Sequence, residues 1–397
     1  DPVDSTREPL RSLLLGVDFV FLEAESNRYE FFLDVIRESP PDLAIVNLDA
    51  DKQKAINLVT QLAHDHPRLS ILVISNDNQA ILQALQRGAK HFLMVPVVLE
   101  DLLLSLRRIM GESGVQDQGR RTVSGGQPSQ IIAVMGSRGG IGCTTLAVNI
   151  ACNLAASPSN SVALVDLDLA LGDADVSLDL MPDHTLADLV MNIEKLDLNF
   201  IKRSMLKHES TGLHVLAHPV QMADIGIIQP AHVERVLNLL RINYTHLVLD
   251  VSKGLSPTDL VALDMADTIL LVAQCELSSL RNVVRILMSL GNVEGVAEKV
   301  RVVINRVGSE FAEAEISLKK AENTIAKPIY WQVPNDAKSV LTARVAGEPL
   351  LIHAPKCRAQ QSIAALAQAL TNQAGPEAHG APTPTGSTGF LKGLFKK

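Results

Sequence analysis

A glycine-rich turn in the middle of the chain has the residue types needed to hold a polyphosphate. In residues 131–154, IIAVMGSRGGIGCTTLAVNIACNL, an apolar strand (Ile131–Met135) leads through the turn into an amphipathic helix that begins near Cys143. Glycines let backbone N–H groups approach phosphate oxygens, and a helix N-terminus adds partial positive charge facing the anion. A plain glycine turn is the alternative. We expect a phosphate cradle, with the Thr144 hydroxyl on Mg²⁺, formed by Gly139, Gly140, Ile141, Gly142, Cys143, Thr144 and Thr145.

One residue of this cradle departs from the usual pattern. Where a loop of the form G-x-x-x-x-G-K-[ST] carries lysine, this chain has Cys143. A neutral thiol cannot make the charge-assisted contact with the β- and γ-phosphates, which typically contributes about 1.5–3 kcal/mol. Phosphoryl transfer depends almost entirely on such charge stabilisation in its transition state. We therefore expect ATP binding to survive and hydrolysis to be weak or absent.

The turn resembles the deviant P-loop of the MinD/ParA family, whose pattern is K-G-G-x-G-K-T-T. Aligned with it, this chain has Arg138 in place of the first lysine, followed by residues 139–145. In that family the first lysine reaches across a nucleotide-sandwich dimer. The resemblance therefore implies a homodimer in which Arg138 contacts phosphate in trans, since a guanidinium keeps the charge and offers two donors. A solvated turn residue is the alternative for Arg138.

The resemblance continues to about residue 370 and implies acidic site residues. Asp166 ends a predicted strand over Val162–Asp166, Asp168 follows it, and Asp250 ends a second strand over Leu247–Asp250. The resemblance implies that Asp166 and Asp250 support Mg²⁺ and that Asp168 orders water as a catalytic residue. Solvated or helix-capping carboxylates are the alternative.

Further positions of the family pattern fall later in the chain. Where the family has D-x-P-x-G after the second strand, this chain has Asp250-Val251-Ser252-Lys253-Gly254, so a switch proline is absent. Two more buried strands are predicted over Thr268–Ala273 and Val300–Ile304. The resemblance implies that the nucleotide base is bound by Asn305, Arg306, Pro334, Asn335 and Asp336.

Breaks in composition divide the chain into parts. We predict a first domain over residues 1–110, a polar, glycine-rich linker over 111–130, a nucleotide-binding domain over 131–371, a disordered tail over 372–388 and a helix over 389–397. Strands alternate with helices in both domains, which indicates parallel sheets with right-handed crossovers. The predicted fold class is α/β, with a flavodoxin-like receiver domain followed by a MinD/ParA-type P-loop NTPase domain.

The first domain resembles a response-regulator receiver domain. Strands are predicted over Asp18–Glu23, Leu43–Leu48, Leu69–Ser75 and His91–Val95, with helices over Arg28–Glu38 and Gln79–Arg87. The slot of the phospho-accepting aspartate holds Asn47, which cannot form an acyl phosphate, and Val95 replaces the usual lysine. We expect a receiver fold used for docking, without phosphorylation. Asp1 and Asp4 align with the acidic pair that follows a receiver's first strand, so that strand is expected to be missing.

A receiver-like domain ahead of a MinD-like domain is the layout of the TadZ/CpaE pilus-assembly proteins. The strings VDLDLALGDADVSLDL, CELSSLRNVVRIL, VVINRVG and VPNDAKSV resemble that group, which often alters the P-loop lysine. The resemblance implies a protein that localises and assembles a Flp-type pilus secretion machinery, at a cell pole or the inner membrane, through other pilus-assembly proteins. Two alternatives stay open: an active MinD/ParA-type ATPase that uses Arg138, and a nucleotide-free adaptor.

Composition excludes several other classes. A net charge of −8 and 3% aromatic residues argue against nucleic-acid binding, and four cysteines without a CxxC pair fit a cytoplasmic protein. The last residues, 389–397, are predicted to form a small amphipathic helix, and they resemble the MinD membrane-targeting helix. Its apolar face would meet the inner membrane while lysines contact anionic lipid. The residues assigned to the membrane are Phe390, Leu391, Leu394, Phe395, Lys392 and Lys396; a soluble tail or a docking peptide is the alternative.

Overall fold

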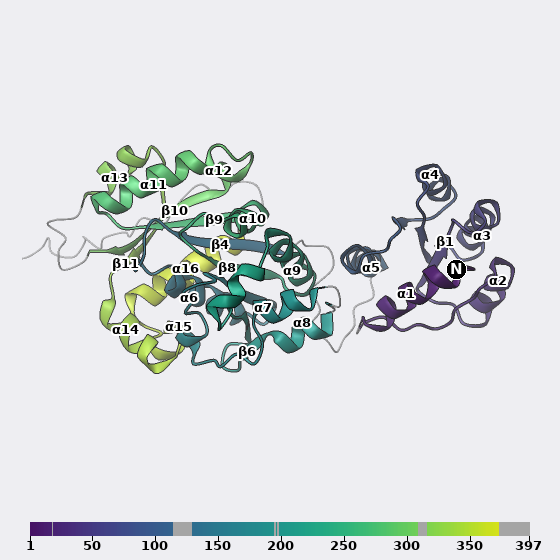
Figure 1. The fold of residues 1–397 in the computed structure, drawn as a ribbon, viewed down its shortest axis with the longest axis horizontal. Coiled ribbons are helices and arrows are strands. Elements are labelled where there is room, and N and C mark those ends of the chain that lie inside the picture. The colour runs from purple at the N-terminus through teal and green to yellow at the C-terminus, as the bar shows by residue number, and fades with distance from the viewer. Residues whose placement is uncertain (18, 114–128, 194–195, 197, 309–315, 373–397) are drawn as a thin grey trace, which may run out of the picture.

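The computed structural model describes residues 1–397 except 18, 114–128, 194–195, 197, 309–315 and 373–397. Two units of alternating helices and strands follow one another along the chain (Figure 1). Their strands form one sheet each, and the printed pairings are parallel except for one antiparallel pair at a sheet edge. The α/β class predicted from the sequence is confirmed.

The first unit is a small sheet covered on both faces. Its strands are ordered β1-β2-β3. Apolar side chains of α2, α3 and α4 cover one face, and those of α1 and α5 cover the other. Gly88, at φ +112°, ends α4 where a side chain would clash with Ala63. The elements are α1 (Asp4–Leu15), α2 (Tyr29–Glu38), β1 (Leu43–Asn47), α3 (Lys52–Asp65), β2 (Ser70–Ile74), α4 (Asn78–Gln86), β3 (His91–Leu93) and α5 (Leu99–Ser113).

One predicted strand of this unit is wrong. Residues 19–25 form no strand, although the apolar run over Asp18–Glu23 predicted one. Phe19 and Val20 pack against the apolar cores, whereas Phe21 is 84% exposed. The apolar residues of this segment are therefore explained by burial of some of their side chains against the cores. The backbone itself is irregular and pairs with no strand among the described residues. The other three predicted strands and both predicted helices are confirmed to within two residues of their ends.

The second unit is built on an eight-stranded sheet ordered β11-β10-β9-β4-β8-β5-β7-β6. Short strands β6 and β7, and edge strand β11, were not predicted. The strands are β4 (Gln130–Gly136), β5 (Val162–Leu167), β6 (Leu206–His208), β7 (Leu213–Leu216), β8 (His246–Val251), β9 (Thr268–Ala273), β10 (Val300–Val307) and β11 (Ile329–Pro334).

Helices cover both faces of this sheet because its central strands are apolar on both sides. Along β4, Ile131, Ala133 and Met135 face one core, while Ile132 and Val134 face the other. The first core includes α7 (Leu186–Met191), α9 (Pro230–Asn243), α10 (Pro257–Met265), α11 (Leu277–Leu290), α12 (Val296–Lys299) and α13 (Leu318–Ile325). The second includes α6 (Cys143–Ala155), α14 (Ala337–Ala346), α15 (Leu350–His353) and α16 (Arg358–Asn372). The remaining helices are α8 (Leu198–Ser204) and the short η1 (Val176–Leu178) and η3 (Met222–Ile227).

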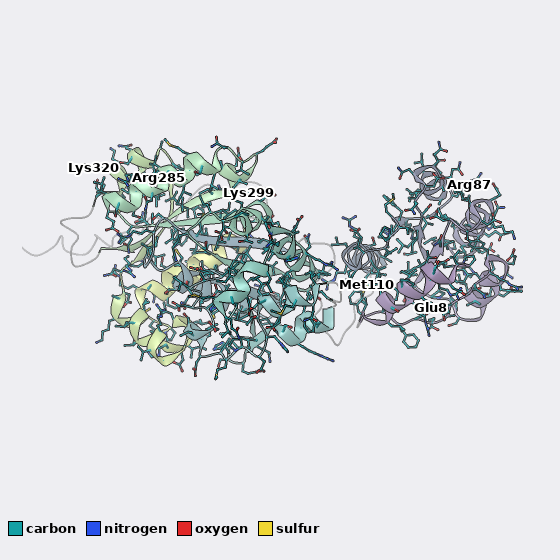
Figure 2. All side chains as sticks on the ribbon, in the orientation of Figure 1. Glu8, Arg87, Met110, Arg285, Lys299 and Lys320 are labelled. Carbon is teal, nitrogen blue, oxygen red and sulfur yellow. The ribbon has the colours of Figure 1, made fainter. Side chains whose placement is uncertain are left out.

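The two units meet through α5 and α9. Leu99 and Leu103 of α5 belong to the same buried apolar cluster as Val233 and Leu237 of α9. Arg107 of α5 also donates a hydrogen bond to Asn243 at 3.5 Å. Figure 2 shows Met110, near the end of α5, on the side of the first unit toward the second. Among the residues described, the helices are all too short or too polar to cross a membrane.

Candidate phosphate-binding site

The glycine-rich turn links β4 to α6 at the carboxyl edge of the large sheet. Gly140 and Gly142 have φ values of +75° and +96°, a conformation that side chains disfavour, and Gly142 caps α6. The loop is fastened to α11 because Asn282 donates to the Ser137 carbonyl at 2.9 Å and the Ser137 and Ser279 hydroxyls lie 2.7 Å apart. A strand, a glycine turn and a helix N-terminus thus stand in the order predicted for a phosphate cradle.

Cys143 fills the lysine position with a small buried group. The residue is 7% exposed, and a side chain on Gly136 would clash with its sulfur. Burial and the charge of Asp250 raise the pKa of the thiol to about 12, so it is neutral at physiological pH. The cradle therefore has no cation at this position, as expected from the sequence.

Two carboxylates lie next to each other below the cradle. Asp166 and Asp250 are register partners on β5 and β8, and they are 0% and 2% exposed. Burial raises the pKa of both, and the charge of Asp166 adds to the rise at Asp250. A hydrogen bond with Thr144 opposes this rise at Asp250, but its Oδ2 has no hydrogen-bond partner among the residues described. An unpartnered buried carboxylate oxygen beside a threonine hydroxyl is a fitting ligand set for Mg²⁺.

Backbone groups and a histidine surround Asp166. It accepts N–H hydrogen bonds from Asp168 and Ala174, both at 3.1 Å. His218 Nδ1 lies 3.6 Å from Asp166 Oδ2 and 4.0 Å from Asp175 Oδ1. Sequence reasoning missed His218 and Asp175. His218 comes just after β7, the neighbour of β5, so the predicted edge of the sheet would have included it had β7 been recognised.

Asp168 is paired with a cation from the neighbouring loop. Lys253 Nζ lies 2.9 Å from Asp168 Oδ2, and the two side chains are 40% and 17% exposed. Lys253 lies in residues 250–254, which align with the D-x-P-x-G pattern, but no role was predicted for it from the sequence. The pair brings one basic group to the edge of the acidic cluster.

Arg138 is paired within its own chain. Its guanidinium lies 2.5 Å from the Glu276 carboxylate and 3.4 Å from the side-chain oxygens of Gln274 and Ser278. These partners precede or begin α11. A contact from Arg138 to phosphate in a partner subunit would exchange the Glu276 pair for the new one.

Asn305 and Arg306, near the end of β10, donate hydrogen bonds to the backbone of the cradle. Asn305 Nδ2 donates to the Ile141 carbonyl at 2.6 Å, and Arg306 donates to the Gly140 carbonyl at 3.0 Å. A side chain on Gly142 would approach Asn305 Nδ2 to 2.7 Å, so glycine is needed there. For Asn305 to pair with an adenine edge, its amide would have to leave the Ile141 carbonyl.

Pro334 is the last residue of β11, and Asn335 and Asp336 connect it to α14. The Asn335 N–H donates to the Val307 carbonyl at 2.9 Å, and Asp336 caps α14 by accepting from the Ser339 N–H at 3.3 Å. This links the turn to the end of β10, the strand that carries Asn305. Three groups of predicted site residues thus lie at the carboxyl edge of the large sheet. They are the glycine turn after β4, Asp166 with Asp250 near the ends of β5 and β8, and Asn305 near the end of β10.

Asn47 of the first unit lies apart from this edge, at the end of β1. It is 4% exposed, and its amide donates to Asp1 Oδ2 at 3.1 Å. The slot predicted for a phospho-acceptor is thus occupied by an amide beside an acidic side chain. The predicted membrane residues, Phe390 to Lys396, lie outside the described part of the chain.

Known proteins resemble the second unit in sequence. Residues 129–302 match the AAA domain family. An uncharacterized ATP-binding protein of Methanocaldococcus jannaschii is 26% identical over 265 residues, which are 66% of this chain and 96% of that protein. The septum site-determining protein MinD of Helicobacter pylori is 28% identical over 228 residues, 56% of this chain and 83% of the relative.

Solved structures share its fold. A ParA family ATPase from Chlorobium tepidum superposes with a TM-score of 0.57 at 23% identity, covering 61% of this chain and 98% of its own. MinD from Pyrococcus horikoshii, complexed with Mg-ADP, gives 0.55 at 22%, covering 62% and 98%. The MinC:MinD complex of Aquifex aeolicus gives 0.53 at 23%, covering 63% and 99%. The sequence matches fall on the second unit, and the solved structures show that this unit has the fold of ParA family and MinD proteins.

Proposed function

We propose that this chain is an ATP-binding, dimerising protein of the MinD/ParA type that localises and helps to assemble a Flp (tight-adherence) pilus secretion machinery. One observation supports this above the others. The phosphate cradle is complete in its backbone, whereas its lysine position is a buried, neutral thiol. Such a site keeps the means to bind nucleotide and loses much of the means to hydrolyse it, as suits a scaffold controlled by occupancy.

In this proposal the cradle holds ATP with Mg²⁺. Backbone N–H groups of residues 139–145 would bind the phosphates, Thr144 would bind the metal, and Asp250 with Asp166 would hold its water ligands. Support comes from Asp250 Oδ2, which is buried without a hydrogen-bond partner in the described residues. When bound, Mg²⁺ neutralises charge on the phosphates. Asp168 would orient a water, and the base would lie near Asn305, Arg306 and the Pro334–Asp336 turn.

Dimerisation would place Arg138 on the partner's nucleotide. The guanidinium is partly exposed and paired with Glu276, so it can move to a new anion without leaving a buried charge behind. An ATPase that depends on Arg138 is the rival function. Hydrolysis rates separate the two.

We assign the first unit to docking of other pilus-assembly proteins. Its strand order and the Asn47–Asp1 contact are compatible with a receiver fold whose phospho-acceptor is an amide. The layout of two units and the strings that resemble TadZ/CpaE proteins are the basis for the pilus role. The tail residues 389–397 would attach the protein peripherally to the inner membrane.

Nucleotide titration and steady-state phosphate release test the core of this proposal. We expect saturable Mg-ATP binding by the purified protein, with little turnover, and turnover that rises at least tenfold in Cys143→Lys. Fast turnover by the natural sequence, abolished in Asp168→Ala, would favour the ATPase instead. Absence of Mg-ATP binding would favour the adaptor without nucleotide.

A further inference from the structure

The cradle lacks a cation where the phosphates of a bound nucleotide would need one. Cys143 is neutral and points into the interior, packed over Gly136. Four negative charges on Mg-free ATP, or about two on Mg-ATP, would enter a site already containing Asp166, Asp168 and Asp250. Without compensation the net charge of the site opposes binding. A basic side chain from another element must supply what the P-loop does not.

Two arginines near the cradle are engaged elsewhere. Arg306 donates to the Gly140 carbonyl at 3.0 Å and so supports the outer backbone of the loop. Arg138 pairs with Glu276 beside α11, and in the proposed dimer it would contact the nucleotide of the partner subunit. Neither arginine therefore supplies charge to the phosphates in the cradle of its own subunit.

Lys253 is placed differently. It follows β8 by two residues, and β8 lies between β4, which leads into the cradle, and β5, which leads to Asp166 and Asp168. Asp250 is the register partner of both Val134 on β4 and Asp166 on β5. The loop that carries Lys253 therefore leaves the sheet between the phosphate cradle and the acidic pair.

The surroundings of Lys253 also allow its ammonium group to exchange one anionic partner for another. Its side chain is 40% exposed and its Nζ contacts Asp168 Oδ2 at 2.9 Å. That contact raises the pKa of Lys253, so the amine stays charged, and the same charge offsets a small part of the rise that burial causes in the pKa of Cys143 and of Asp250. Its field thus already reaches the thiol that stands in the lysine position.

We propose that Lys253 replaces the missing P-loop lysine: on binding of Mg-ATP its ammonium group moves from Asp168 to the phosphates. The basic charge is supplied by the loop after β8 in place of the N-terminus of α6. The exchange also releases the Asp168 carboxylate. This inference rests on the proposed nucleotide-binding function and assigns a binding residue to that same site.

Calorimetric titration with Mg-ATP tests the assignment in the full-length chain. We expect Lys253→Met to weaken binding about 10- to 100-fold, the loss typical of one charge-assisted contact. Lys320→Met is the matched control, since Lys320 is exposed on α13 at the edge of the second unit (Figure 2). It should bind like the natural sequence. Circular dichroism and the fluorescence of Trp331, the single tryptophan, verify that each variant is folded.

Two further variants distinguish a phosphate contact from a merely structural ion pair. Asp168→Asn breaks the pair but leaves the lysine free, so it should bind Mg-ATP as well as the natural sequence or better. Cys143→Lys in the Lys253→Met background should recover most of the lost affinity. Equal weakening by Asp168→Asn and Lys253→Met, or unchanged binding in Lys253→Met, overturns the inference. If the natural sequence itself binds no Mg-ATP, the proposed function fails first.

Discussion

At the scale of single residues, the site is built at the expense of stability. Asp166 and Asp250 are buried side by side, and Asp250 Oδ2 has no hydrogen-bond partner among the described residues. Burying a charge without full pairing costs free energy, which the rest of the fold must offset. A divalent cation would remove this cost. The pair is therefore explained as a ligand site better than as a structural contact.

Asp250→Asn should stabilise the protein without nucleotide, by about 2 kcal/mol, because it replaces a buried carboxylate with a neutral amide of similar size. Chemical denaturation at pH 8 would measure this. Glu294→Gln, at an exposed site, is the control and should change little. The same Asp250→Asn substitution should weaken Mg²⁺-dependent nucleotide binding. Loss of stability in Asp250→Asn would contradict a strained carboxylate pair.

The stability of the protein without nucleotide should also fall as pH rises through this pair. Burial raises the pKa of both carboxyls in the folded state, so the folded state binds more protons than the unfolded state above about pH 4. The free energy of unfolding then decreases with pH until the raised pKa values are passed. In Asp250→Asn this slope should be smaller.

At the scale of helices and strands, the sequence predicted those elements whose signals are local. The strand, glycine turn and helix of the cradle, the strand Thr268–Ala273 and the helix predicted over Gln79–Arg87 were recognisable from a few neighbouring residues. β6 and β7 were missed because strands of three and four residues show little periodicity. Asp18–Glu23 was predicted wrongly because an apolar run fits irregular chain packed on a core as well as it fits a strand.

The candidate site divides in the same way. Cys143, Thr144 and the acids at strand ends follow from motif spacing, and the structure brings them to one sheet edge. The contacts that hold the site residues in place do not follow from motif spacing. They join residues far apart in the chain: Arg138 with Glu276, Asn305 with Ile141 and Lys253 with Asp168. Such contacts depend on the packing of several elements, and no local pattern encodes them.

The contact between α5 and α9 predicts coupling between the two units. Leu103 is 0% exposed in the shared apolar cluster, whereas its neighbour Leu104 is 46% exposed. Leu103→Ala should lower the free energy of unfolding by about 3 kcal/mol, and Leu104→Ala by less than about 0.5 kcal/mol.

Trp331, in β11 of the second unit, provides the readout. Because it reports on the second unit, a shift of its denaturation midpoint in Leu103→Ala shows that the helix contact stabilises both units together. A midpoint that stays with that of the natural sequence would mean that the units unfold independently.

At the scale of the whole molecule, nucleotide occupancy and membrane attachment should be linked. The proposed anchor over residues 389–397 has four apolar side chains and lysines at 392, 396 and 397, too little for one copy to bind lipid firmly. Two copies in a dimer bind as one bivalent ligand, in which the second contact benefits from a high effective concentration. If Mg-ATP promotes dimerisation, it should therefore promote attachment. The whole chain carries a net charge of −8, so its basic tip is the part suited to an anionic surface.

Co-sedimentation with vesicles containing phosphatidylglycerol tests this link. We expect the natural sequence to pellet with Mg-ATP about tenfold or more above its level without nucleotide, and to lose this binding when residues 389–397 are deleted. Deleting nine residues of the adjoining tail, 376–384, is the matched control, since it shortens the chain but keeps the anchor. Vesicles of phosphatidylcholine alone should retain little protein because the lysines then meet no anionic lipid. Equal pelleting with and without residues 389–397 would show that the chain contacts the membrane elsewhere or not at all. Tail-dependent pelleting that ignores Mg-ATP would instead separate the anchor from the nucleotide site, leaving dimerisation without a role in attachment.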